Sequence, residues 1–164
     1  MTFTLLDRIV SVEPHKSITA TKNLSLGEEY LADHFPGNPV MPGVLQLEAM
    51  VQAAAWLLRV SQNFSHSVVV FADGRSIRYG KFVAPGDQLT VDVTLAQIEN
   101  GKAWFQGKGS VNGSVAVKGR FSLRFYNLAD KNKDLADMDK HLIEGFKRKF
   151  RELGGTTLLE GFAV

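Results

Sequence analysis

Residues 34–62 restrict the possible folds of this chain more than any other stretch. The first part, residues 34–42, contains three prolines, each of which lacks an N–H and disfavours a helical conformation in the residue before it. From Gly43 to about Gln62 there is no internal proline or glycine, and Pro42 stands where a helix can begin without losing a hydrogen bond. The sequence therefore predicts a loop followed by a helix of roughly 30 Å, at 1.5 Å per residue.

The predicted helix is apolar on nearly all of its faces, which is typical of a helix buried in a core. Glu48 and Gln52 interrupt it on one face, and Ala55 and Arg59 continue that face. A buried carboxylate needs a partner or must take up a proton, because burying a lone charge is costly. Glu48 therefore either pairs with Arg59 or a backbone donor, or forms a functional site with His34 and the glycine that begins the helix.

The remainder of the first 127 residues has the pattern of hairpin-connected strands. Residues 89–95 alternate between apolar and polar side chains, as a strand with one buried face does. Residues 68–71 are continuously apolar, which we interpret as a central strand buried on both faces. Residues 99–102 and the Asn112-Gly113 pair predict hairpin turns. The predicted strand regions are residues 9–13, 17–21, 68–71, 73–82, 89–95 and 115–126. An antiparallel sheet wrapped around the single long helix buries both elements, so the expected fold class is α+β.

The composition changes after Asn127. Apolar residues recur at three- and four-residue spacing from Leu135 to Leu153, with basic residues on the other faces, and two glycines follow. We therefore divide the chain into a domain of residues 1–127 and a C-terminal amphipathic extension of residues 128–164. Its apolar stripe is expected to pack on the domain or on a second subunit, and docking to a membrane surface or a partner is the alternative.

Length and composition exclude several classes of site. The 164 residues suffice for one domain with its own core, and the absence of cysteine excludes disulfides, thiolate metal sites and cysteine nucleophiles. A net charge of +2 gives no argument for nucleic acid. The N-terminus lacks a basic region followed by an apolar run, and polar residues interrupt the long apolar stretch. We expect neither a signal peptide nor a membrane span, and a cytoplasmic location follows by default.

Two segments carry a family resemblance. Residues 34–52 contain a His-Phe-Pro loop, a Pro-Val-Met-Pro-Gly-Val-Leu helix entry and a Glu-Ala-x-x-Gln sequence, and residues 82–89 read Phe-Val-Ala-Pro-Gly-Asp-Gln-Leu. Together they resemble the beta-hydroxyacyl-[acyl-carrier-protein] dehydratases of type II fatty acid synthesis, over about residues 5–126. The resemblance implies a hotdog fold, in which an antiparallel sheet wraps around one long central helix.

The resemblance also implies a reaction, the dehydration of (3R)-3-hydroxyacyl thioesters. That reaction needs a base for the proton on C2, and a histidine, ordinarily half-neutral near pH 6.5, is suited to this task. It needs an acid for the departing hydroxyl, and a glutamic acid in an apolar helix is favoured in its protonated form by desolvation. By resemblance, His34 is the base and Glu48 the acid. The N–H of Gly43, at the positive end of the helix dipole, polarises the thioester carbonyl.

In this family the two catalytic residues that face one substrate come from different subunits, which implies a homodimer and, beyond it, an assembly of three dimers. The implied partner is an acyl carrier protein, for which Arg75, Arg78 and Lys81 are candidate docking residues. A solvated strand face is the alternative interpretation of these three. No metal or organic cofactor is implied. The candidate substrate-binding residues are Gly43, Val44, Tyr30, Phe35, Met41 and Phe82.

Two departures from the family pattern stand out. A Pro-His-Arg-like opening segment is missing before Leu6-Asp7-Arg8, and the C-terminal helix is an addition. Both are compatible with a specialised paralogue in a polyketide-like or unusual lipid pathway. Glu48 replaces the aspartate of the related dehydratase that also isomerises double bonds, which argues against isomerase activity. A hotdog thioesterase and a non-catalytic acyl-binding subunit remain as alternatives.

Overall fold

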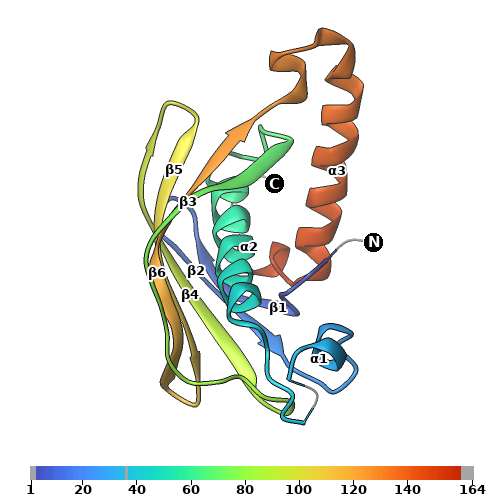
Figure 1. Ribbon diagram of the computed structural model, residues 1–164. Coiled ribbons are helices and arrows are strands. Elements are labelled where there is room, and N and C mark those ends of the chain that lie inside the picture. The colour runs from blue at the N-terminus through green and yellow to red at the C-terminus, as the bar shows by residue number, and fades with distance from the viewer. Residues whose placement is uncertain (1–2, 36, 160–164) are drawn as a thin grey trace.

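A single antiparallel sheet packs against one face of the long helix α2 (Gly43–Ser61), as Figure 1 shows. The computed structural model describes residues 3–35 and 37–159. Within these residues the strand order is β1-β2-β4-β5-β6-β3, and every neighbouring pair is antiparallel. The strands are β1 (Arg8–Glu13), β2 (Ser17–Asn23), β3 (Val68–Tyr79), β4 (Gln88–Glu99), β5 (Lys102–Val111) and β6 (Ser114–Tyr126). The remaining helices are α1 (Tyr30–Asp33) and α3 (Ala136–Glu152), with 3-10 turns at Leu128–Asp130, Lys133–Leu135 and Thr156–Leu159. The expected α+β class is confirmed.

Two predicted hairpin turns are confirmed. Asn100 and Gly101 connect β4 to β5 with φ angles of 50° and 72°, and Asn112 and Gly113 connect β5 to β6 with 49° and 79°. Positive φ at both central residues is the type I′ geometry, whose twist matches that of the flanking strands. The two turns fix the register of three consecutive strands.

The core lies between α2 and the sheet. Met50 and Leu57 of α2 are fully buried, and Leu89, Val91 and Val93 of β4 point towards them. Gly107 of β5 allows the helix to come this close, since a Cβ at that position would lie 2.9 Å from the Sδ of Met50. Burial of each large side chain stabilises the fold by about 1.5–3 kcal/mol.

The prediction that residues 68–71 form a central strand buried on both faces was wrong. They belong to β3, which continues to Tyr79 as one strand with irregularities near residues 72 and 76–77, and β3 lies at the edge of the sheet. Val70 and Phe71 are 43% and 45% exposed. A continuous apolar run indicates burial on both faces, but an edge strand with an uncovered apolar surface has the same sequence pattern.

Helix α3 lies on the side of α2 that faces away from the sheet (Figure 1). Trp56 of α2 contacts Phe146 and Phe150 of α3, with ring centroids 6.1 and 5.9 Å apart. Near the start of α3, Asp139 accepts hydrogen bonds from the Ser67 hydroxyl and from the amides of residues 128 and 129. Beyond its end, the carbonyl of Leu153 accepts a hydrogen bond of 2.9 Å from the amide of Ile9. None of the described helices is long and apolar enough to cross a membrane.

Candidate active site

The loop before α2 presents His34 and Phe35. His34 follows α1 with an extended backbone and is half-buried, and its ring packs edge-on against that of Phe35 at 4.6 Å. Phe35 has a φ of 51°, a left-handed conformation that costs an L-residue about 1–2 kcal/mol. Its carbonyl accepts a 2.8 Å hydrogen bond from Asn38, which closes the turn. Pro36, the third residue of the predicted loop motif, lies outside the described residues.

The N-terminus of α2 is held close to two other segments. Gly43 is its first residue, so its N–H has no intrahelical acceptor. The Tyr79 ring lies beside it, since a Cβ on Gly43 would be 3.0 Å from the ring. Met41 donates a 2.8 Å backbone hydrogen bond to the carbonyl of Val83, which ties the loop to the segment that follows β3.

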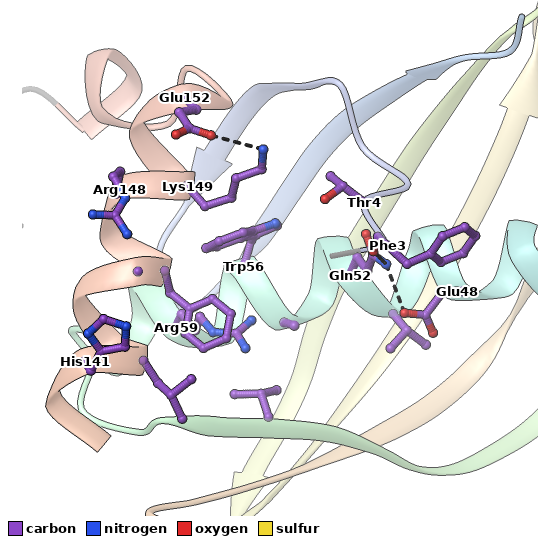
Figure 2. A pocket seen from close by; sticks show the side chains of 16 residues that line it. Phe3, Thr4, Glu48, Gln52, Trp56, Arg59, His141, Arg148, Lys149 and Glu152 are labelled. Carbon is purple, nitrogen blue, oxygen red and sulfur yellow. Dashed lines mark hydrogen bonds and ion pairs between the residues drawn. The ribbon is translucent and has the colours of Figure 1, made fainter. Parts of the chain in front are cut away.

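Glu48 is half-buried on α2, and Gln52 determines its orientation. The Nε2 of Gln52 donates to the Oε1 of Glu48 at 3.0 Å and to the carbonyl of Phe3 at 3.1 Å, while its Oε1 accepts from the amide of Leu5 at 2.9 Å. Figure 2 shows this amide between the carboxylate and the N-terminal segment. The alternative in which Glu48 pairs with Arg59 is wrong, because the partner of Glu48 is Gln52.

Glu48 lines a cavity of about 610 Å³ between α2 and α3. One wall is the stripe of α2 that carries Glu48, Gln52 and Arg59, and the other includes His141 of α3 (Figure 2). Phe146 of α3 also lines the cavity. His34 is not among the residues that line this cavity. Within one chain, the two predicted catalytic residues are therefore not brought together around it.

The predicted substrate-binding residues fall into two groups. Phe35, Val44 and Phe82 are exposed, Val44 and Phe82 by 69% and 68%. Met41 is buried, and Tyr30 is half-buried with a hydroxyl that has no hydrogen-bond partner among the described residues. Burial, and then the negative charge of Glu28, raise the pKa of Tyr30. None of the five lines the cavity at Glu48.

The predicted docking residues are exposed on and just after β3. Arg75 pairs with Asp73 at 3.1 Å and lies opposite Arg120 of β6, and Arg78 lies opposite Lys118. Lys118 and Arg120 alternate with buried residues of β6, so they lie on the face of the sheet that points away from α2. Sequence reasoning missed these two residues, although their alternation in a predicted strand was the available signal.

The family model and the sequence relatives agree on one family. Residues 1–120 match the FabA-like domain. The 3-hydroxyacyl-[acyl-carrier-protein] dehydratase FabZ of Coxiella burnetii is 39% identical over 119 residues, which cover 71% of this chain and 84% of that protein. The FabZ of Variovorax paradoxus is 42% identical over 119 residues, which cover 71% of this chain and 79% of that protein. The chain belongs to the FabA-like family of dehydratases.

Solved structures confirm the fold of this FabA-like protein. The dehydratase heterocomplex ApeI:P from Xenorhabdus doucetiae matches with a TM-score of 0.65 at 20% identity, covering 81% of this chain and 90% of that chain. The likeness confirms the predicted hotdog fold. The segment that matches the FabA-like domain contains His34, Gly43 and Glu48, whereas α3 lies beyond its end.

Proposed function

We propose that this protein dehydrates (3R)-3-hydroxyacyl-[acyl-carrier-protein] to the trans-2-enoyl thioester, in fatty acid or related lipid synthesis. The observation that supports the proposal is the hydrogen bond by which Gln52 holds Glu48 in a half-buried position on α2 of a FabA-like chain. His34 removes the proton from C2, and the C2–H electron pair forms the double bond to C3. Glu48 gives its proton to the hydroxyl that leaves C3 as water. The Gly43 N–H donates to the thioester oxygen, on which negative charge develops.

A homodimer is part of the proposal. His34 does not line the cavity at Glu48, so one chain lacks a complete pair in that cavity. The edge of β3 exposes Val70 and Phe71, and an apolar edge strand is a template for pairing with a second copy. We propose that two β3 edges pair and that His34 of each chain serves Glu48 of the other. Three such dimers in turn assemble into a hexamer.

The route of the substrate follows from exposure and charge. Phe35, Val44 and Phe82 offer apolar surface near the N-terminus of α2, and Met41 and Tyr30 are the buried and half-buried members of the same candidate set. An acyl carrier protein, which is acidic, is proposed to dock on the basic residues of β3 and β6, where Arg75 and Arg78 stand beside Arg120 and Lys118. Lys81 extends this surface.

The proposal also covers the division of the chain and its location. The catalytic unit is residues 1–127, residues 128–164 are an extension of it, and the protein works in the cytoplasm.

The test is a hydration and dehydration assay with enoyl and 3-hydroxyacyl thioesters on carrier protein, followed by the absorbance of the conjugated enoyl group. The wild type is compared with His34→Ala and Glu48→Gln. Both variants should lose about 100-fold or more in turnover, because each removes one proton-transfer group. Release of free thiol by His34→Ala would instead indicate a thioesterase. A wild type that binds carrier protein but turns over no chain length would indicate a non-catalytic subunit.

A further inference from the structure

Arg59 is a buried cation that lines the cavity between α2 and α3. Its side chain is on α2, only 8% of the residue is exposed, and its Nε has no hydrogen-bond partner in the described part of the chain. Among the described residues no carboxylate forms an ion pair with it. The guanidinium instead lies 3.9 Å from the centroid of the Phe146 ring and 5.3 Å from that of Trp56. Burial lowers the pKa of Arg59 to about 10, which leaves it charged at neutral pH.

The surroundings of Arg59 are basic and apolar. It lines the cavity between α2 and α3 together with His141, Arg148 and Lys149 of α3. The two carboxylates that line the cavity already have partners, since Glu152 pairs with Lys149 at 3.0 Å and Glu48 accepts from Gln52. Trp56, Phe146 and neighbouring aliphatic side chains supply the apolar surface. A volume of about 610 Å³ is in the range of pockets that bind small molecules.

The α2 residues that line the cavity form a stripe along the helix axis. Glu48 and Arg59 are eleven residues apart on α2, which places them on the same face and roughly 16 Å apart along the axis. Figure 2 shows the two side chains at separate points along this helix, with Gln52 and Trp56 between them. A linear apolar chain that lies along this stripe can reach from the carboxylate to the guanidinium.

We propose that the Arg59 end of this cavity binds a carboxylate carried on an apolar chain, with the chain lying along α2 beside Trp56. A carboxylate supplies a counter-charge that no described residue provides, and it accepts charge-assisted hydrogen bonds from the guanidinium fork. Two sources share this chemistry. One is the distal carboxylate of a dicarboxylic 3-hydroxyacyl thioester whose reacting end lies at Glu48, and this source rests on the proposed function. The other is a free fatty acid, and its binding does not depend on the proposed function.

The binding test uses dodecanoate and its neutral methyl ester as probes, by calorimetry and by the fluorescence of Trp56, against Trp56→Phe to assign the signal. The wild type should bind dodecanoate about 10-fold or more tightly than the ester, which corresponds to about 1.4 kcal/mol. Arg59→Met should abolish this preference. Arg151→Met is the matched control, because Arg151 is exposed on α3 and does not line the cavity, and it should retain the preference.

Three results would overturn the proposal: equal affinity for acid and ester in the wild type, a preference that survives in a folded Arg59→Met protein, or failure of the wild type to bind dodecanoate. Thermal melts establish whether each variant is folded. If Arg59→Met does not fold, the pair Arg59→Lys and Arg59→Gln decides, since only the lysine variant should keep a preference for the acid.

Turnover distinguishes the two sources. If the carboxylate belongs to the substrate, Arg59→Met lowers kcat/KM about 10-fold for a thioester with a distal carboxylate and leaves the methyl-ended thioester of equal length unchanged. If the ligand is a free fatty acid, both values of kcat/KM stay unchanged while dodecanoate binding is lost. A wild type that binds dodecanoate but turns over no thioester refutes the proposed function and leaves this site in place.

Discussion

Gln52 joins Glu48 to the N-terminal segment through a single amide, which donates to the carboxylate at 3.0 Å and to the carbonyl of Phe3 at 3.1 Å. The same side chain accepts from the amide of Leu5. The orientation of the proposed catalytic acid therefore depends on a segment that lies more than forty residues away in sequence.

Replacement of Gln52 by leucine should lower kcat by about 10–100-fold with a smaller change in KM, because Glu48 loses the group that orients it. The variant should also lose about 1–3 kcal/mol of unfolding free energy, since the amide of Leu5 loses its acceptor. Steady-state kinetics and urea denaturation measure the two effects. Gln62→Leu, just beyond the end of α2, is the control and should alter neither. An unchanged kcat in folded Gln52→Leu would contradict the positioning role.

Gly43→Ala should reduce kcat/KM about 10-fold or more. The added Cβ would lie 3.0 Å from the Tyr79 ring, so the ring or the helix N-terminus must shift by a few tenths of an ångström. A shift of that N-terminus moves the N–H proposed to polarise the thioester. The double variant Gly43→Ala with Tyr79→Leu removes the obstructing ring and should recover part of the loss. If Gly43 is needed for another reason, the double variant will have the same reduced kcat/KM as Gly43→Ala alone.

Asp139 should make stability depend on pH in the acid range. Burial acts to raise the pKa of Asp139, but hydrogen bonds from Ser67 and from the amides of Ala129 and Leu128 outweigh it and hold the pKa below the ordinary 3.8. The contribution of a carboxyl with a depressed pKa is fully present above its ordinary value and is lost as pH falls through the lower folded-state value.

Thermal unfolding of Asp139→Asn checks this dependence. At pH 7 the variant should melt several degrees below the wild type, and the difference should shrink as the pH falls below 3.8. Asp137→Asn is the matched control, because the side chain of Asp137 is exposed and pairs only with exposed Lys140 in the described structure. A difference that stays constant across the acid range would rule out the assigned linkage.

The double variant Val70→Lys, Phe71→Lys should be monomeric and inactive. Lysines on an edge strand oppose pairing with a second strand, because their charges must be desolvated. Analytical ultracentrifugation and the enoyl assay measure the two properties. Val10→Lys places a charge at an exposed position of β1, at the opposite edge of the sheet. It should leave the oligomeric state and the activity unchanged. A variant that remains an active dimer would show that β3 is not the interface.

Local signals predicted much of the fold. The type I′ turns at Asn100 and Asn112 follow from Asn-Gly pairs, and the start of α2 follows from Pro42. The edge position of β3 did not follow, because a buried central strand and an edge strand with an uncovered apolar surface have the same sequence pattern. In the proposed dimer a second copy covers Val70 and Phe71, and the sequence of residues 68–71 alone carries no information about that contact.

Of the contacts in the candidate site, one could be predicted from the sequence and the others could not. The spacing from Glu48 to Gln52 placed them on one face, and the hydrogen bond between them follows from that spacing. The alternative pairing of Glu48 with Arg59 fails because eleven residues of rigid helix keep the two far apart. The contacts of Arg59 with Phe146 could not be read from sequence, since they depend on how the chain returns after residue 127.

The two tethers of α3 have a mechanical consequence. Asp139 ties its first turn to Ser67, and the bond from Ile9 to the carbonyl of Leu153 ties its other end to β1. Because α3 is held at both ends, it cannot rotate away from α2 about one end. The spacing between the two helices is therefore set by the rings of Trp56 and Phe146. Evolution of a wider or narrower cavity would then proceed by exchanging these rings, with the backbone left in place.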